Sequence, residues 1–101
     1  MVSNTHFDFD RFLETYKGGI SVLEGKALAR YSENVGTGCI VEIGSYKGKS
    51  AIAFSYGLSK RQDNTVQVYC IEPHQEFVGV LGGKFGPEDR ADFYKIMLDT
   101  G

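Results

Sequence analysis

Apolar residues recur at two different periods along this chain of 101 residues, and the periods predict helices and strands in a mixed order. Near the N-terminus, four apolar residues have the spacing of one face of a short helix. They are Phe9, Phe12, Leu13 and Tyr16. After a Gly-Gly break, Ser21 can cap a second helix that runs to about Asn34. Its predicted apolar face consists of Leu23, Ala27, Leu28, Tyr31 and Val35. Gly25 inside this helix costs about 1 kcal/mol relative to Ala, so it indicates a late helix start or a close approach by another group.

The middle of the chain has the pattern of one strand–helix–strand unit. Residues 39–43 are almost continuously apolar, which is typical of a strand in a parallel sheet covered on both faces. Residues 49–58 have a helical apolar pattern, and residues 66–71 form a second predicted strand.

The C-terminal part is less regular. After Glu72-Pro73 we expect an irregular stretch that includes Phe77, Val78, Val80 and Leu81, and then a flexible loop over residues 82–86. Pro87 suits the first turn of a last helix, with Phe93, Ile96 and Met97 on its apolar face. The sequence therefore predicts an α/β fold: a Rossmann-like parallel sheet with flanking helices, truncated to two clear strands and about four helices. Residues 1–38 supply N-terminal helices and residues 39–101 a βαβα segment of a single partial domain.

Composition excludes several classes of partner. A net charge of -2 provides no basic field for nucleic acid. No apolar run approaches the roughly 20 residues that a membrane span needs, and the N-terminus lacks the pattern of a signal peptide. Cys39 and Cys70 should lie about three residues out of step on neighbouring strands, or ~10 Å apart, too far for a disulfide. We expect two buried thiols in a reducing compartment, the cytoplasm.

The segment with the clearest chemistry follows the first predicted strand. Gly44 comes directly after the strand and Gly48 opens the next helix, where free N–H groups favour a carboxylate or phosphate. Ser50 can add a hydroxyl to that site. Glu72 ends the neighbouring strand, so its carboxylate should lie beside the Gly44 loop and can accept the hydroxyls of a ribose. These features predict a ligand with an anionic end and a ribose.

Three classes of ligand compete for such a loop. A dinucleotide site needs Gly-x-Gly-x-x-Gly, whereas three residues separate the glycines here. A nucleoside-triphosphate loop needs four residues before Gly-Lys-Ser, and this loop is one short. Glu42, Gly44 and Gly48 instead follow an acid-x-Gly-x-x-x-Gly pattern.

Residues 40–50, Ile-Val-Glu-Ile-Gly-Ser-Tyr-Lys-Gly-Lys-Ser, resemble the first motif of class I S-adenosylmethionine-dependent methyltransferases of the catechol and caffeoyl-CoA O-methyltransferase type. Glu24-Gly25-x-x-Leu28 resembles the helix before that motif, and Ile71-Glu72-Pro73 the acidic end of the second strand. The similarity covers roughly residues 20–80. It implies S-adenosylmethionine as cofactor and a small-molecule methyl acceptor, with O-methylation as the expected reaction. In such enzymes the catalytic and metal-binding acids follow later strands, so this chain alone should be incomplete and inactive.

The resemblance also implies a role for each site residue. Gly44, Ser45 and Tyr46 would line the methionine part of the cofactor, with Gly48 completing the loop. Ser50 would hold its carboxylate, Glu42 would act near its ammonium, and Glu72 would hold the ribose. No metal ligand or catalytic residue is assigned.

Several alternatives stay open at this stage. The Tyr46 ring can equally be simple packing, and the Glu42 carboxylate needs either a ligand ammonium or a basic side chain. His74 is interpreted as a surface residue. A non-catalytic Rossmann-like module for nucleotide binding or assembly is the alternative function. Because two strands leave both sheet edges open, we expect a homo-oligomer or an element-swapped dimer.

Overall fold

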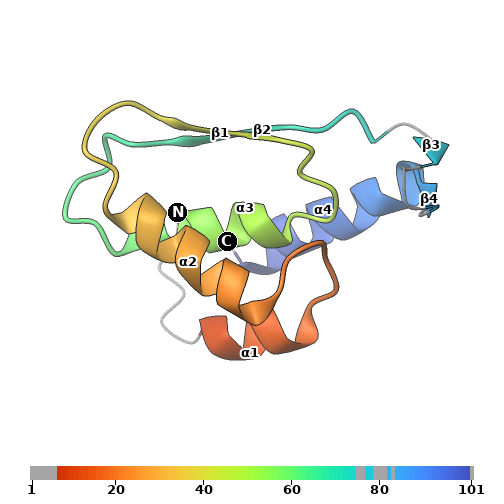
Figure 1. The fold of residues 1–101 in the computed structure, drawn as a ribbon, viewed down its shortest axis with the longest axis horizontal. Helices are drawn as coiled ribbons and strands as arrows, with labels where there is room; N and C mark the ends of the chain where they lie inside the picture. The colour runs from red at the N-terminus through yellow and green to blue at the C-terminus, as the bar shows by residue number, and fades with distance from the viewer. Residues whose placement is uncertain (1–6, 75–76, 79–81, 83, 101) are drawn as a thin grey trace.

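The computed structural model describes residues 7–74, 77–78, 82 and 84–100, which form four helices and two small two-stranded sheets (Figure 1). The helices are α1 (Phe9–Thr15), α2 (Val22–Glu33), α3 (Lys49–Ser59) and α4 (Pro87–Thr100). β1 (Ile40–Ile43) pairs in parallel with β2 (Val68–Ile71), and β3 (Phe77–Val78) pairs antiparallel with β4 (Lys84–Phe85). The predicted α/β class is thus confirmed, and so is the strand–helix–strand unit of β1, α3 and β2.

The register of β1 and β2 places Ile40 opposite Val68 and Glu42 opposite Cys70. Cys39 therefore lies three positions out of step with Cys70, as predicted, and both thiols are free. The prediction that both are buried is wrong, because both residues are exposed. Cys39 precedes the first paired residue of β1, and β2 has no further strand beside it in the described part of the sheet.

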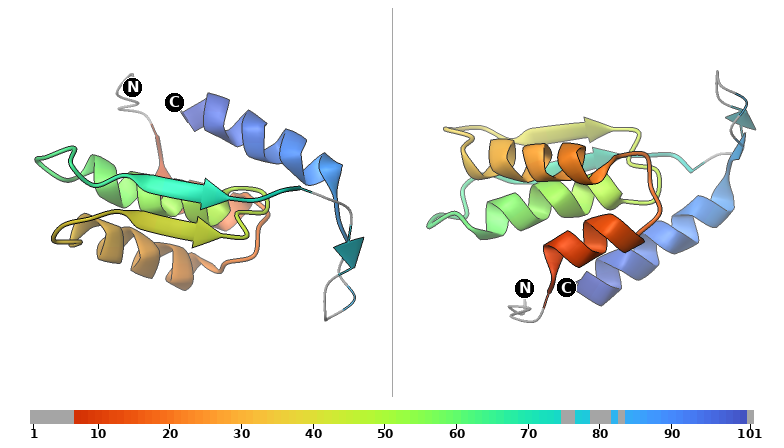
Figure 2. Two further views of the ribbon diagram at one scale, coloured as in Figure 1. Left: turned by 90° about the horizontal axis from the view of Figure 1, so that it is seen from above. Right: turned by 60° about the horizontal axis from the view of Figure 1, so that its bottom comes forward.

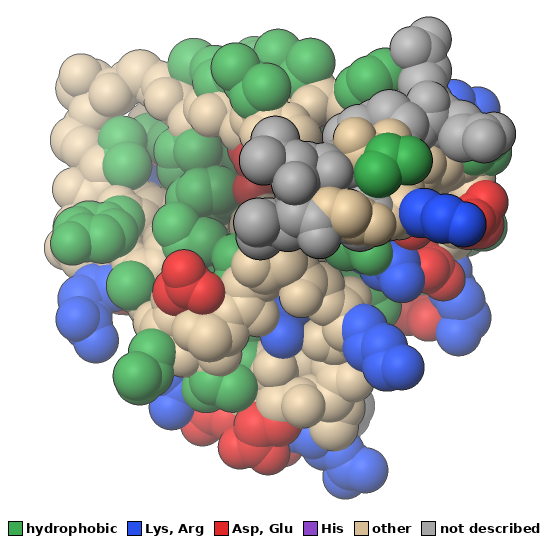
Figure 3. Space-filling model, turned by 45° about the vertical axis from the view of Figure 1, so that its right-hand side comes forward, with side chains coloured by type: hydrophobic (Ala, Val, Ile, Leu, Met, Phe, Trp, Pro, Cys, Tyr) green, Lys and Arg blue, Asp and Glu red, His purple; other side chains and the backbone are tan. Residues whose placement is uncertain are grey.

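Only one face of the parallel sheet is covered. Helices α2 and α3 lie against it, and Figure 2 (left) looks onto the opposite face, which no described helix crosses. That face exposes four large side chains, paired across the strands: Val41 (55%) with Tyr69 (54%), and Ile43 (81%) with Ile71 (54%). Hydrophobic side chains accordingly lie along the top of Figure 3, where the sheet lies. The expected coverage of both faces is wrong, because all the helices lie on the other side of these two strands.

Small residues bring α2 and α3 into close contact. Gly25, Ala29 and Ser32 are the buried residues of α2. A Cβ atom on Gly57 of α3 would lie 2.0 Å from the Ala29 carbonyl oxygen and 2.0 Å from Ser32 Oγ, so only glycine fits there. Ser32 Oγ also lies 2.9 Å from the carbonyl oxygen of Phe54, which ties the two helices together.

This packing contradicts part of the predicted apolar face of α2, although Leu28 of that face is partly buried and packs against the core. Leu23 is 80% exposed and Tyr31 is 72% exposed. The helix buries its small residues because they allow the backbones to approach, and Leu23 and Tyr31 consequently lie on the exposed side. For Gly25 the close-approach interpretation is confirmed, since a Cβ there would lie 2.3 Å from Leu13 Cδ2.

The other helices follow the sequence pattern. Phe9, Phe12 and Leu13 of α1 are buried, as predicted, in a core that also contains Ile52 of α3 and Ile96 of α4. Ser21 caps α2 and forms a capping box with Glu24, in which each side chain accepts from the backbone N–H of the other residue. In the described part of the chain, none of the helices has the length and apolar character that a membrane crossing requires.

The segment before α4 is more regular than predicted. Lys84 and Phe85 lie inside the expected flexible loop but pair as β4 with Phe77 and Val78 of β3. The other two apolar residues of this stretch, Val80 and Leu81, lie outside the described residues. α4 begins at Pro87 as predicted, and Asp89 accepts a hydrogen bond from the Gly86 N–H, with 3.0 Å between Oδ2 and N.

Candidate functional site

The loop of residues 44–48 joins the carboxyl end of β1 to the first turn of α3. The Gly44 N–H donates to the Ile71 carbonyl oxygen across 2.8 Å, which extends the ladder by one residue. The chain then turns with φ of +84° at Gly44 and +88° at Gly48, values that favour glycine. Gly48 is the N-cap of α3, and no side chain caps this helix. The first turn of α3 therefore has no side-chain cap among the described residues.

Glu72 lies beside this loop, as predicted from the ends of the parallel strands. Its Oε1 accepts a hydrogen bond from the Tyr46 N–H at 2.8 Å, and its Oε2 accepts one from the His74 N–H at 3.1 Å. One carboxylate therefore joins the glycine loop to the segment that follows β2. Because each carboxylate oxygen can accept two hydrogen bonds, these contacts leave acceptor capacity on both oxygens.

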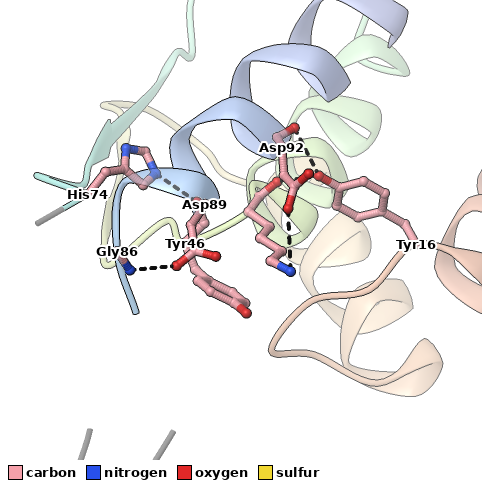
Figure 4. Close-up of polar contacts among 7 residues, drawn as sticks. Tyr16, Tyr46, His74, Gly86, Asp89 and Asp92 are labelled. Atoms are coloured by element: carbon pink, nitrogen blue, oxygen red, sulfur yellow. Dashed lines mark hydrogen bonds and ion pairs between the residues drawn. The ribbon is translucent and has the colours of Figure 1, made fainter. Parts of the chain in front are cut away.

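His74 completes this connection, and its interpretation as a surface residue is wrong. The residue is only 8% exposed, and its Nε2 donates to the Tyr46 carbonyl oxygen at 2.8 Å (Figure 4). Tyr46 and His74 both have left-handed backbones, with φ of +50° and +52°, which non-glycine residues rarely adopt. The only sequence signal for His74 is its position directly after the Glu72-Pro73 strand end. The contact between Tyr46 and His74 produces no repeat of apolar and polar residues, so sequence periodicity could not predict it.

Two polar atoms under the loop lack partners. Glu42 Oε1 and Ser45 Oγ are both buried, and neither makes a hydrogen bond within the described residues. Ser45 is 2% exposed, so its side chain points into the protein. A buried acceptor without a partner costs about 1–3 kcal/mol, and more when it is charged. Within the described residues, no basic side chain pairs with this oxygen of the Glu42 carboxylate.

The Cys70 thiol adjoins these two groups. Although the residue as a whole is exposed, partial burial of the thiol raises the pKa of Cys70; the Ser45 hydroxyl opposes this shift, and the charge of Glu42 adds to it. Cys70 stands directly opposite Glu42 in the strand register. The three side chains thus form one polar cluster at the end of the sheet, with an acidic group at its centre.

The remaining predicted residues surround the loop. Ser50 is partly buried in the first turn of α3. The Tyr46 ring meets the Phe85 ring edge to face, with centroids 5.2 Å apart, so β4 contacts the loop. This contact supports the interpretation that the Tyr46 ring has a packing role, with Phe85 as its partner.

Helix α4 supports the loop from the side of α3, and the sequence pattern did not indicate this role. A Cβ on Gly48 would lie 3.0 Å from Phe93 Cδ2 and 3.1 Å from Met97 Cε. Near this contact, Lys47 Nζ forms an ion pair with Asp92 Oδ2 at 3.4 Å. The apolar spacing of α4 could identify its buried face, but not which loop that face would cover.

Tyr16 connects α4, the loop and the segment after α1. Its hydroxyl lies 2.7 Å from the Lys47 carbonyl oxygen and 3.1 Å from that of Asp92 (Figure 4). Burial, and then the charge of Asp92, raises the pKa of Tyr16 to about 12. Because the hydroxyl stays protonated, it remains a donor to the loop.

One other feature of the molecule, a pocket between helices, does not belong to this site. A pocket of about 340 Å³ lies among α1, α2 and α3, and none of its lining residues comes from the loop or the strands. Within the described residues, no three His, Cys, Asp or Glu side chains gather as metal ligands would.

Comparisons of this chain with protein-family models, with curated proteins and with solved structures all give no match.

Proposed function

We propose that this chain is the S-adenosylmethionine-binding part of a class I methyltransferase that acts on a small-molecule acceptor, with a Rossmann-like sheet as its scaffold. The observation that carries the proposal is the unpartnered Glu42 Oε1, buried at the carboxyl end of β1. When bound, S-adenosylmethionine supplies an electrophilic methyl group on a sulfonium centre. The residues of this chain bind and orient that molecule.

Glu42 is assigned to the ammonium group of the cofactor. A carboxylate oxygen that is buried without a partner is costly, and a ligand cation that donates to it removes this cost. The Ser45 hydroxyl beside it can accept a second N–H of the same ammonium. A nucleoside phosphate offers no such donor and would instead be repelled by the carboxylate. The polarity of this cluster therefore favours S-adenosylmethionine over a nucleotide.

The loop and α3 are assigned to the carboxylate end of the cofactor. Apart from Gly44 and its two chain neighbours, no atom of the described residues lies within 4 Å of the position where a Gly44 Cβ would lie, so a ligand can approach the backbone there. The helix N-terminus provides N–H groups and a partial positive charge for an anion. Ser50 in the first turn adds a hydroxyl donor.

Glu72 is assigned to the ribose. Its two oxygens are already held by backbone N–H groups of Tyr46 and His74, which fix the carboxylate in one orientation. Its remaining lone pairs can accept the two ribose hydroxyls. In this assignment Glu72 both shapes the loop and binds the cofactor, while His74 and Tyr46 are positioning residues. Proton transfer from the acceptor is assigned to no residue of this chain, so we expect binding without turnover.

Isothermal titration calorimetry with S-adenosylhomocysteine tests the assignment of Glu72, and a titration with S-adenosylmethionine tests that of Glu42. We expect saturable binding, weakened at least about tenfold by Glu72→Ala, as loss of about 1.4 kcal/mol predicts. Glu14→Gln, which neutralises an exposed acid on α1, is the matched control and should leave binding unchanged.

The alternative is a module that binds a nucleotide or serves in assembly. It is favoured if the folded protein binds ATP or NAD but not S-adenosylhomocysteine, or if Glu72→Ala and Gly44→Val leave cofactor binding unchanged. Failure of a well-folded sample to bind S-adenosylhomocysteine would remove the proposed function for this chain.

A further inference from the structure

Lys49 is the only buried lysine among the described residues. It is 7% exposed, whereas the other lysines are partly or fully exposed. Lys26, Lys47 and Lys95 each pair with an aspartate, but Lys49 forms no ion pair or hydrogen bond with the described residues. Buried lysines in proteins are as a rule paired. Lys49 therefore lacks an anionic partner that the described part of the chain does not supply.

The segment between α1 and α2 covers the side chain of Lys49. A Cβ atom on Gly18 would lie 2.7 Å from Lys49 Cβ and 3.0 Å from Lys49 Cδ, so the lysine chain runs along the Gly18 backbone. Two residues earlier, the Tyr16 hydroxyl lies 2.7 Å from the Lys47 carbonyl oxygen and holds this segment against the loop (Figure 4). The methylene groups of Lys49 are thus enclosed between this segment and the first turn of α3.

Lys49 lies at the N-terminal end of α3 and directs its side chain towards that end. It is the first residue of the helix, and the Cα–Cβ bond of a helical residue tilts towards the helix N-terminus. Its Nζ keeps contact with solvent, because the fully buried side-chain atoms without a partner in the described residues are Glu42 Oε1 and Ser45 Oγ. The helix N-terminus has no side-chain cap and favours an anion. The lysine and the helix end thus place positive charge together.

Glu42 and Lys49 are unpartnered charges of opposite sign on either side of one loop. The Gly48 N–H donates to the Ser45 carbonyl oxygen at 2.8 Å, so the loop between them is a compact turn. No ion pair joins the two charges. A phosphate would satisfy the lysine and leave the carboxylate unpaired, and a simple amine would do the reverse. An α-amino acid carries an ammonium and a carboxylate on one carbon atom, so it satisfies both.

We propose that Lys49 binds the carboxylate of the amino-acid part of the ligand, and that the site selects its ligand by this part. The inference rests on the proposed function, which assigns the carboxylate to the N–H groups of α3 and to Ser50 alone. A hydrogen bond from a charged ammonium is roughly twice as strong as a neutral one, so Lys49 is the main determinant for the carboxylate. The ligand class is therefore a nucleoside that carries an α-amino acid.

Calorimetric titrations with two nucleosides test this assignment. S-adenosylhomocysteine carries the amino-acid part, and 5′-methylthioadenosine is a nucleoside thioether without it. Lys49→Met keeps the apolar chain beside Gly18 but removes the ammonium. It should weaken binding of S-adenosylhomocysteine at least about tenfold and leave binding of 5′-methylthioadenosine unchanged. Lys17→Met, at an exposed lysine next to Gly18, is the matched control and should leave both affinities unchanged.

The outcomes separate this assignment from the proposed function. A loss of affinity for S-adenosylhomocysteine alone supports Lys49 as the ligand of the carboxylate. If Lys49→Met binds S-adenosylhomocysteine as tightly as the wild type, or loses affinity for both nucleosides in parallel, the assignment is wrong while the proposed function stands. If the folded wild type binds neither nucleoside, the proposed function fails and this assignment fails with it.

Gly18→Ala tests the position of the lysine without changing its charge. The added methyl group would lie 2.7 Å from Lys49 Cβ, so the lysine chain must move. Gly19→Ala is the control, because apart from the chain neighbours nothing lies within 4 Å of its added methyl group. Affinity for S-adenosylhomocysteine should be lower in Gly18→Ala than in Gly19→Ala, with equal affinity for 5′-methylthioadenosine and unchanged circular dichroism. Equal affinity of both variants for S-adenosylhomocysteine would overturn the proposal.

Discussion

The carboxylate of Glu72 accepts a hydrogen bond from the backbone N–H of Tyr46, with 2.8 Å between Oε1 and N. This contact joins the end of β2 to the loop after β1, and it holds Tyr46 in a left-handed backbone conformation with φ of +50°. Such a conformation persists only where surrounding contacts enforce it. The same carboxylate holds His74, so a single side chain maintains two strained residues.

Glu72→Ala should therefore destabilise the protein even without a ligand. Two backbone N–H groups lose a charged acceptor, which costs about 1.5–3 kcal/mol in the free energy of unfolding. Glu72→Gln should cost less, because its amide oxygen still accepts from one of the two N–H groups. Urea unfolding followed by circular dichroism measures both values. If the alanine variant is as stable as the wild type, Glu72 does not hold the loop.

Glu42→Gln should separate binding from stability. The substitution replaces a carboxylate, whose Oε1 is buried without a partner among the described residues, with a neutral amide of the same shape, so the unliganded protein should be at least as stable as the wild type. Affinity for S-adenosylmethionine should nevertheless fall at least about tenfold, since the ammonium loses a charged acceptor. Calorimetry and urea unfolding on the same samples supply the two numbers. A residue with a purely structural role would lose stability and keep its affinity, the opposite result.

The contact between α2 and α3 leads to a third prediction. Gly57→Ala places a methyl group 2.0 Å from the Ala29 carbonyl oxygen, a backbone atom that cannot move alone. We expect a loss of about 3 kcal/mol or more in the free energy of unfolding, at the upper end of overpacking effects. Gly36→Ala is the control, because nothing lies within 4 Å of its added methyl group. Equal stability of the two variants would contradict the close helix contact.

Sequence patterns correctly predicted the features that depend on a few neighbouring residues, such as helix caps and turns. The Ser21 cap, the Pro87 helix start and the two glycine turns each follow from the conformational needs of one residue. The parallel pairing of β1 and β2 and the nearness of Glu72 to the loop follow from strand topology.

The errors arise where distant segments compete for the same surface. The face that α2 buries was determined by how closely Gly57 lets α3 approach, which no periodicity within α2 records. His74 is buried because α4 and the loop cover it, so its surroundings come from segments far away in the sequence. The apolar residues of β1 suggested cover on both faces, but a strand pattern cannot show on how many sides helices will lie.

The alkaline stability of the protein tests the role of Tyr16. Its pKa is raised from 10.0 to about 12 in the folded protein, so above pH 10 the unfolded chain releases this proton while the folded chain keeps it. The Tyr16 contribution to stability is thus complete below pH 10 and is lost as the pH rises from 10 towards 12.

The pKa of Lys47 is also raised; burial opposes the shift, but Tyr46 and Asp92 outweigh it. Lys47 therefore adds a decline of the same sign in any Tyr16 variant. Tyr16→Phe should therefore cost about 1 kcal/mol at pH 7, for the lost hydroxyl contacts, and show a shallower decline above pH 10. Urea unfolding at several pH values between 7 and 11, with Tyr31→Phe as the exposed control, gives both quantities. Parallel declines in Tyr16→Phe and wild type would mean that the Tyr16 hydroxyl is not held between the loop and α4.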